Sequence, residues 1–363
     1  FVDARKVAGE AADHLAALTR ISKPGELEPR LRAFREKDKR VRVDAGTAAA
    51  AIWRILGKSA VRGADPCIAP KAVKCTAEIR GARAAHVRDA AAMCRFLAWL
   101  DASASHGEID EIAAVRELER CRRASPMLRE ISFDTISGSG PNGAIVHYRV
   151  TAPTNRKLKS GELFLIDSGA QYADGTTDIT RTVAIGKPSA EMRERYTAVL
   201  KGHIAISMAR FPKGTRGVDL DPLARGPLWD LGLDYDHGTG HGVGSYLSVH
   251  EGPASISKRG MVELKPGMIL SNEPGYYKTG AYGIRIENLV LVEDQPAPAD
   301  ERPMLGFDTV TLVPIDLGLV EPRLLDETER AWLNAYHGRV REALTPLADP
   351  AVRDWIAGAT RPI

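Results

Sequence analysis

Residues 163–182 read LFLIDSGAQYADGTTDITRT. Leu163–Ser168 and Thr177–Val183 are rich in apolar and β-branched residues and flank an Asp-Gly turn, which predicts a β-hairpin. Asp167 ends the first strand, where a buried carboxylate is costly unless it is paired or bound to a metal. Asp178 lies on the expected partner strand, and like charges facing each other across a sheet are destabilising unless a cation bridges them. The sequence leaves the register of the two strands open.

Three further candidate ligands lie downstream: His241 in HGTGHGVG, Glu273 in SNEPGYY and Glu287 in IRIENLV. Taken singly, each carboxylate or imidazole has an ordinary structural explanation, such as a turn, a strand end or an Arg285–Glu287 ion pair on one strand face. Four carboxylates in one cleft would repel each other strongly unless cations neutralised them. One imidazole among carboxylates favours manganese, cobalt, iron or zinc over magnesium or calcium. If the candidates converge in space, they predict a two-metal hydrolase.

The composition argues against several classes of protein. The chain has 363 residues, of which 44% are hydrophobic and 27% charged, which is typical of a globular protein with two or three domains. The net charge of +3 and the absence of long Lys/Arg runs predict no nucleic-acid surface. No apolar run approaches the roughly 18 residues of a membrane helix. The cysteines form no CxxC pair, which favours a reduced, cytoplasmic protein; they are Cys67, Cys75, Cys94 and Cys121.

Residues 1–74 predict a small α/β domain that is incomplete on its N-terminal side. Apolar periodicity predicts, in order, a strand at Phe1–Asp3, helices at Glu10–Leu18 and Glu26–Phe34, a strand at Arg40–Val43 and a helix at Ala48–Leu56. Prolines at positions 66 and 70 mark a linker. Because the chain begins at a phenylalanine within an expected strand, residues upstream are expected to be missing, and an N-terminal targeting segment is left open.

Residues 75–363 predict one larger α+β domain. Thr76 and Asp326 are expected to cap its first and last helices. Helices are expected at Ala77–Leu100, Ile109–Arg122, Glu191–Arg210, Asp219–Leu231 and Glu327–Ala343, with further strands at Ile269–Asn272 and Gly283–Val292. Gly138–Gly143 reads GSGPNG and predicts a tight turn, because it lacks the lysine of a phosphate-binding loop.

Taken together, the motifs resemble those of the metal-dependent Xaa-Pro aminopeptidases, which belong to the pita-bread peptidases together with methionine aminopeptidase and prolidase. The resemblance covers residues from about 65 to 363. It rests on GPNGAIVHY, DSGAQYADGTTDITRT, LDYDHGTGHGVG, SVHEGP, NEPGYY and GIRIENLV. It implies a pita-bread catalytic domain at 75–363, preceded at 1–74 by part of the creatinase-type middle domain of the long, three-domain form. The N-terminal domain of that form is expected to be absent.

The resemblance also implies a cofactor. The expected ligands of two divalent ions are Asp167, Asp178, His241, Glu273 and Glu287. Asp178 and Glu287 would bridge the two ions. Manganese is the expected metal, with zinc or cobalt as alternatives. Because no expected ligand is missing, the resemblance argues against a relative that has lost its activity.

Four further roles are implied for the substrate site. His147 and His250 match two substrate-site histidines, His237 matches a histidine of the pocket lining, and Arg285 matches an arginine two residues before the last ligand. The expected reaction is hydrolysis of the bond between a first residue and a following proline, by a metal-activated water. His250 would stabilise the oxyanion, His147 would hold the substrate near the proline nitrogen, and Glu273 would shuttle a proton to that nitrogen.

Three alternatives remain open. A prolidase would cleave only Xaa-Pro dipeptides; an aminopeptidase acting on peptides with proline in the second position is favoured, because the C-terminal runs TLVPIDLGLV and WLNAYH of the long form are present. A methionine aminopeptidase would need a shorter chain, and a non-catalytic peptide-binding module would not need every ligand. The resemblance predicts a homodimer. Trp229, Leu231 and Leu233 would serve its interface if exposed, although core packing is the ordinary role of such residues.

Overall fold

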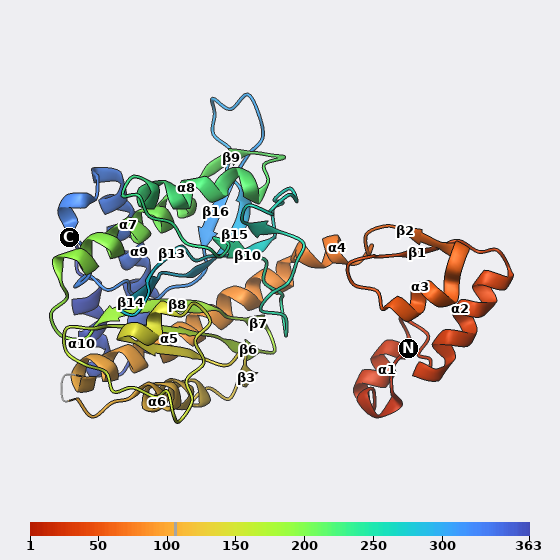
Figure 1. The fold of residues 1–363 in the computed structure, drawn as a ribbon, viewed down its shortest axis with the longest axis horizontal. Helices are drawn as coiled ribbons and strands as arrows, with labels where there is room; N and C mark the ends of the chain where they lie inside the picture. Colours follow the sequence, from red (N-terminus) through yellow and green to blue (C-terminus); the bar gives the residue numbers. More distant parts are fainter. Residues whose placement is uncertain (105–106) are drawn as a thin grey trace. The chain divides into compact units, whose positions relative to one another are not determined.

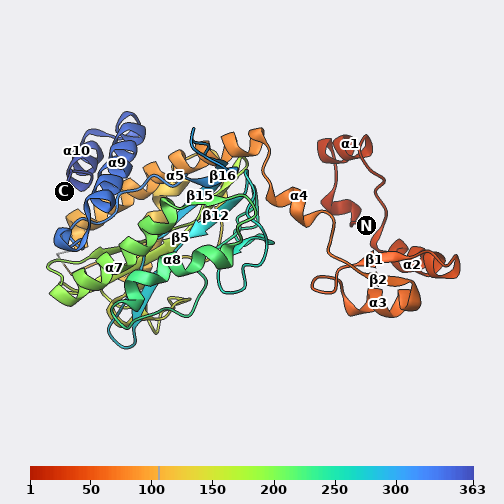
Figure 2. The same ribbon diagram turned by 90° about the horizontal axis from the view of Figure 1, so that it is seen from above.

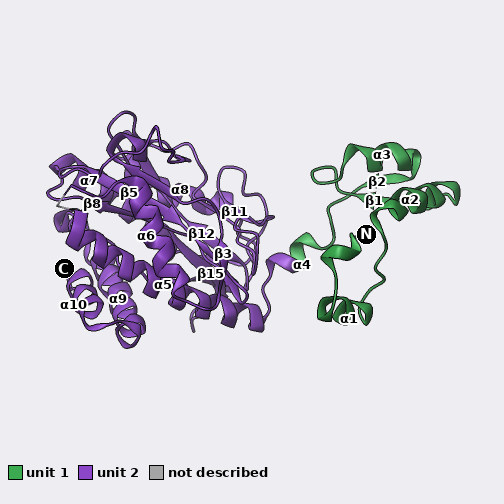
Figure 3. Ribbon diagram, turned by 90° about the horizontal axis from the view of Figure 1, so that it is seen from below, with its two compact units in different colours: residues 1–70 green, residues 71–363 purple. Residues whose placement is uncertain are grey.

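The computed structural model describes residues 1–104 and 107–363, and the chain divides into two compact units, residues 1–70 and 71–363 (Figure 3). The division falls within α4 (Ile68–Ala72), in the segment expected to be a linker. Each unit encloses a hydrophobic core of its own. None of the helices in the described residues combines the length and the hydropathy that a bilayer-spanning segment requires.

The first unit is a small α/β arrangement around one pair of parallel strands. Its elements are η1 (Ala4–Lys6), α1 (Glu10–Ala16), η2 (Pro24–Glu26), α2 (Leu27–Glu36), β1 (Val41–Val43), α3 (Ala50–Leu56), η3 (Gly57–Ser59) and β2 (Ala60–Arg62). Apolar side chains of α2, α3 and β1 form its core. The strand predicted at Phe1–Asp3 is wrong, because the Asp3 carboxylate accepts a hydrogen bond from the Arg5 amide (3.0 Å) and begins a short 3-10 helix.

The second unit packs long helices against antiparallel sheets (Figures 1 and 2). Its helices are α5 (Thr76–Ser103), α6 (Glu111–Arg123), η5 (Gly140–Ala144), α7 (Ala190–Ser207), α8 (Gly217–Trp229), η6 (Pro322–Leu324), α9 (Glu327–Leu344), η7 (Thr345–Leu347) and α10 (Pro350–Ala359). Figure 2 shows α7 and α8 lying side by side. Their close approach needs Gly202, where a Cβ atom would lie only 2.1 Å from the Ala224 carbonyl oxygen.

The caps and ends of the helices agree with the sequence predictions at some positions and differ at others. Asp326 caps α9 as predicted, since its carboxylate accepts from the Glu329 amide at 2.8 Å. The cap of α5 is Cys75 rather than Thr76, because the Glu78 carboxylate reaches back to the Cys75 amide (2.8 Å). The helix predicted to reach residue 210 ends three residues earlier, and residues 210–212 form a strand instead. Helix α10 was not predicted.

Short strands build several small sheets. They are β3 (Leu128–Ile131), β4 (Ile136–Ser139), β5 (Leu163–Ser168), β6 (Ala170–Tyr172), β7 (Gly175–Thr176), β8 (Ile179–Ala184), β9 (Arg210–Pro212), β10 (Gly240–His241), β11 (Ser255–Ile256), β12 (Ile269–Asn272), β13 (Gly275–Lys278), β14 (Tyr282–Arg285), β15 (Asn288–Asp294) and β16 (Met304–Thr309). The predicted pairing of β5 with β8 is confirmed. The connection between them is itself a small hairpin, in which β6 pairs with β7. Asp167 lies opposite Thr180, so Asp178 does not face it directly.

The strand predicted over Gly283–Val292 is interrupted. β14 pairs with β13 and β15 pairs with β12, and residues 286–287 between β14 and β15 belong to neither ladder. The segment that pairs with these two strands is interrupted at the same position, because residues 273–274 separate β12 from β13. Glu273 and Glu287 therefore lie at one shared break, residues 273–274 and 286–287. Here two antiparallel segments of the chain pass from the sheet that contains β12 and β15 to the sheet that contains β13 and β14.

Candidate metal centre

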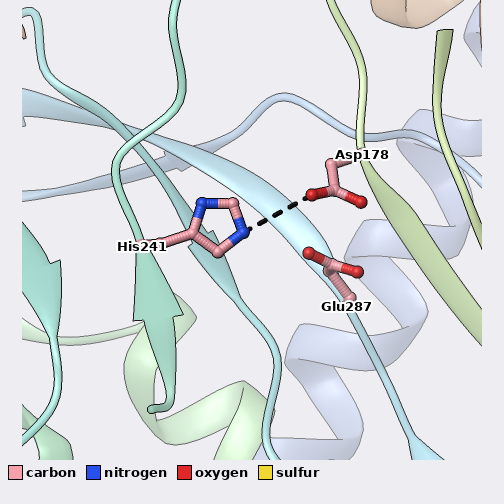
Figure 4. A group of neighbouring side chains, drawn as sticks. All are labelled: Asp178, His241 and Glu287. Carbon is pink, nitrogen blue, oxygen red and sulfur yellow. Dashed lines mark ion pairs between the residues drawn. The ribbon is translucent and has the colours of Figure 1, made fainter. Parts of the chain in front are cut away.

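Strand ends bring the candidate ligands together. Asp178 immediately precedes β8, Glu287 lies at the shared break, and His241 ends β10, and one ligand atom of each lies within 4.8 Å of the others. Figure 4 shows the three side chains pointing toward one another. The His241 Nε2 atom lies 3.5 Å from Asp178 and 3.6 Å from Glu273. Asp167, at the end of β5, interacts electrostatically with Asp178, Glu273 and Glu287.

These carboxylates are held in an environment that opposes their ionisation. Burial, followed by the charge of neighbouring carboxylates, raises the pKa of Glu287 well above its usual range. Burial likewise raises the pKa of Asp178 to about 6 and that of Glu273 to about 7. Burial opposes protonation of His241, but the Asp178 and Glu273 carboxylates raise its pKa to about 9. Burial is therefore the main cause of the raised carboxylate pKa values, and repulsion between the carboxylates adds to it.

The residues fit divalent cations. One carboxylate oxygen of Asp167 and one of Asp178 are buried without a hydrogen-bond partner, which is unfavourable unless a cation binds them. His241 donates from Nδ1 to the Gly242 carbonyl (3.0 Å), which leaves Nε2 free to coordinate. Oxygen ligands with one imidazole suit manganese, cobalt, iron or zinc. The donor set thus has the composition of a transition-metal site.

Arg285 supports Asp167 rather than Glu287. Its Nη2 atom lies 2.6 Å from the Asp167 carboxylate, so the Arg285–Glu287 pair considered from the sequence is not formed in the described structure. Glu287 is oriented by Thr180, whose hydroxyl donates to its carboxylate (2.7 Å) and whose carbonyl accepts from its amide (3.1 Å). Thr180 was missed from the sequence, because an uncharged residue within a strand gives no chemical signal.

A directional hydrogen-bond chain connects this arginine to His237. Arg285 Nη1 donates to the Tyr277 hydroxyl (2.6 Å), which lies 2.8 Å from His237 Nε2. His237 Nδ1 donates to the Gly238 carbonyl (2.8 Å), so Nε2 must accept the tyrosine proton. Burial, and then the Arg285 charge, lowers the pKa of His237 to about 4, consistent with a neutral ring. Tyr277 was also missed, although it is the last residue of the motif NEPGYY.

The remaining histidines lie near the cluster. The His250 ring packs edge-on against the His241 ring, with centroids 4.1 Å apart. His147 is exposed, and it makes a small electrostatic contribution to the lowered pKa of both His237 and His250. His250 thus lies beside His241, and His237 is linked to Asp167 through Tyr277 and Arg285.

Buried charged residues outside the cluster hold two of the histidine-bearing loops. Glu111 is fully buried, and its carboxylate accepts from the Ser139 amide (2.7 Å) and the Tyr148 hydroxyl (3.1 Å), beside His147. Arg225 donates to the His237 carbonyl (2.8 Å). Because each anchor is buried, the two loops are fixed by contacts that do not involve the histidine rings.

The chain belongs to metallopeptidase family M24. The model of that family matches residues 80–294, and a model of the C-terminal region of M24 peptidases matches residues 303–363. The predicted pita-bread fold of the catalytic domain is confirmed by this match and by solved structures of the family.

Curated relatives with similar sequences are aminopeptidases. Aminopeptidase P2 of Arabidopsis thaliana is 48% identical over 299 residues, which are 81% of this chain and 42% of that protein. A probable Xaa-Pro aminopeptidase P of Coprinopsis cinerea is 46% identical over 301 residues, which are 81% of this chain and 48% of that protein. The chain therefore spans about half the length of the curated relatives it matches.

Solved structures show the same fold. An X-prolyl aminopeptidase from Caenorhabditis elegans, described as a cytosolic enzyme with a di-nuclear active site, matches with a TM-score of 0.95 and 37% identity. That match covers 100% of this chain and 61% of the other. A Xaa-Pro dipeptidase from Bacillus anthracis matches with a TM-score of 0.66 and 25% identity, covering 80% of this chain and 78% of the other.

Proposed function

We propose that this chain contains the catalytic part of an aminopeptidase that releases the first residue of peptides with proline in the second position. The observation that carries the proposal is the convergence of buried carboxylates and His241 within an M24 fold. Preference for proline is supported by the names of the curated relatives. A prolidase is the second candidate, supported by the weaker likeness to a dipeptidase at 25% identity.

We also propose the metal ligands. Asp167, Asp178, His241, Glu273 and Glu287 would hold two divalent ions, with Asp178 and Glu287 shared between them. Manganese is the proposed metal, and zinc or cobalt would suit the same donors. When bound, the ions would supply Lewis acidity and a water molecule of lowered pKa.

The protein's own groups would position the peptide and move the proton. The Ser271 hydroxyl donates to one oxygen of Glu273 (3.0 Å), which orients that carboxylate to accept a proton and pass it to the proline nitrogen. This transfer matters because a secondary amine leaves only after protonation. Burial lowers the pKa of His250, so its neutral ring would donate a hydrogen bond to the oxyanion. His147, His237 and Arg285 would line the substrate site.

Assembly and location belong to the same proposal. Trp229 is 47% exposed and Leu231 is 40% exposed, whereas Leu233 packs against the main core. The exposed pair supports a role in a homodimer interface, and Leu233 has the core role that such residues ordinarily have. A cytoplasmic location is supported by the description of the Caenorhabditis elegans relative as cytosolic.

The test is release of the first residue from an Xaa-Pro-Xaa peptide and from an Xaa-Pro dipeptide. Each is assayed with purified protein after chelation and again after manganese is added back. Loss and recovery of tripeptide cleavage are expected, and Glu287→Ala is expected to remove metal and activity together. His250→Ala is expected to lower turnover more than metal content. Cleavage of the dipeptide alone would identify a prolidase, and unchanged activity after complete metal removal would exclude the proposed site.

A further inference from the structure

A buried lysine, Lys74, lies two residues before the long helix α5. The Lys74 side chain is 2% exposed, and its Nζ atom lies 3.0 Å from the Glu251 carboxylate, which is itself 10% exposed. Burying an ammonium group is unfavourable by several kcal/mol unless a partner compensates it. The pair joins residues 177 positions apart in the sequence. Such a contact therefore fixes two distant segments relative to each other.

The lysine end of this pair belongs to the rigid part of the unit. The Lys74 amide donates to the Gly267 carbonyl (2.9 Å), and the Gly267 amide donates to the Val292 carbonyl (2.9 Å). Strand β12, which leads to Glu273, begins two residues after Gly267, and α5 begins two residues after Lys74. Lys74 is thus attached to the sheet that carries one of the proposed ligands.

The glutamate end belongs to the loop that carries His250. Residues 242–251 form a closed loop, because the Glu251 amide donates to the Gly242 carbonyl (2.8 Å) and the Gly244 amide donates to the Ser248 carbonyl (2.7 Å). Among the described residues, the His250 ring packs edge-on against the His241 ring and makes no side-chain hydrogen bond. The position of His250 is consequently set by its backbone, and Glu251 is its immediate neighbour.

We propose that Lys74 is a positioning residue, which holds the His250 ring over the carboxylate cluster through its ion pair with Glu251. The inference rests on the proposed peptidase function, because it assigns His250 to the reacting carbonyl. A displacement of about 1 Å in a catalytic group can lower turnover about a hundredfold. Loosening the backbone at His250 is therefore expected to lower kcat. The proposed metal ligands, and Arg285 and His237 of the proposed substrate site, lie outside residues 242–251, so kcat is expected to change more than KM or metal content.

The chain offers a matched control on the same carboxylate. Lys71 lies 2.9 Å from the other Glu251 oxygen, but its side chain is 64% exposed. A solvent-exposed ion pair contributes little to stability, so losing it is expected to leave the loop in place. Comparing Lys74→Met with Lys71→Met therefore separates a buried anchor from a surface charge of the same type.

The first experiment measures kcat, KM and bound metal with an Xaa-Pro-Xaa peptide. For Lys74→Met, kcat is expected to fall at least about tenfold, with KM and metal content within about twofold of wild type. For Lys71→Met, all three values are expected to stay within about twofold. The double variant Lys74→Met/Glu251→Met also removes the carboxylate that would otherwise keep only the exposed Lys71 as its partner, so its stability is expected to recover while kcat stays low. Recovery of kcat together with stability, or an unchanged kcat in Lys74→Met, would overturn the proposal.

The second experiment does not depend on catalysis. Amide hydrogen exchange of residues 244–251 is expected to accelerate in Lys74→Met, while exchange of residues 163–168 is unchanged. Equal exchange in wild type and variant would overturn the proposed anchor, whether or not the protein cleaves peptides. A wild-type protein without metal-dependent cleavage would instead contradict the proposed function, and the exchange result would still decide whether Lys74 holds the loop.

Discussion

Replacing Asp178 by asparagine is expected to stabilise the metal-free protein while preventing metal binding. Asp178 is 4% exposed, and burial raises its pKa from 3.8 to about 6. A tenfold change in an ionisation equilibrium corresponds to about 1.4 kcal/mol, so ionised Asp178 destabilises the metal-free folded state by about 3 kcal/mol at neutral pH. Asparagine has nearly the same shape and carries no charge, so the variant avoids this penalty.

The pH dependence of the stability difference shows whether ionisation of Asp178 is its cause. Because the folded-state pKa of Asp178 is above its unfolded value, the folded protein retains the proton and loses stability as pH rises through the range between the two values. The difference between Asp178→Asn and wild type is therefore expected in full at about pH 7.5 and is expected to disappear near pH 4. Metal added back is expected to stabilise the wild type alone.

Urea unfolding of chelated protein, followed by tryptophan fluorescence, measures this difference at both pH values. Asp174→Asn is the control, since Asp174 pairs with Arg88 at 3.0 Å and that hydrogen bond lowers its pKa. This partly exposed pair contributes less than about 1 kcal/mol, so the control is expected to be slightly less stable than wild type. If Asp178→Asn were also less stable than wild type at both pH values, the electrostatic reasoning would be refuted.

Three further predictions concern the surroundings of the site. Arg181→Lys is expected to destabilise the second unit by about 3 kcal/mol in urea unfolding. Lysine cannot replace the six hydrogen bonds of the buried guanidinium. A change below about 1 kcal/mol would contradict this reasoning. Tyr277→Phe is expected to lower kcat/KM about tenfold with metal content unchanged, because His237 loses its donor; normal kinetics would argue against the hydrogen-bond chain. Burial lowers the pKa of His337 from 6.5 to about 3, so its stabilisation is complete above pH 6.5 and is lost as pH falls toward 3. His337→Gln is expected to reduce the change in melting temperature between pH 6.5 and pH 3. An unchanged pH dependence of the melting temperature would exclude His337 as its cause.

The sequence predicted most of the regular elements that carry the candidate ligands. The apolar run before Asp167 and the cap at Asp326 are local signals, and both elements formed as expected. The strand expected around Glu287 was placed correctly but predicted as continuous. Its interruption depends on pairing with two different partners, β12 and β13, and a single strand pattern does not encode that.

Residues that act through hydrogen bonds were harder to predict than residues that carry charge. Candidate ligands stand out because a buried carboxylate needs an explanation. Thr180 and Tyr277 are ordinary strand residues in sequence, and their roles follow only from the three-dimensional contacts with Glu287 and His237. Lys74 was likewise inconspicuous, since its partner lies 177 residues away.

The shared break between the two pairs of strands has a consequence for how the unit would lose its structure. Glu273 lies between β12 and β13, and Glu287 lies between β14 and β15, so cations bound there would add a connection between the two sheets to the hydrogen bond from the Ile286 amide to the Pro274 carbonyl (3.3 Å). Bound metal would then make the two sheets unfold as one cooperative block. Chelation is expected to separate them into steps, with the β13–β14 ribbon opening first.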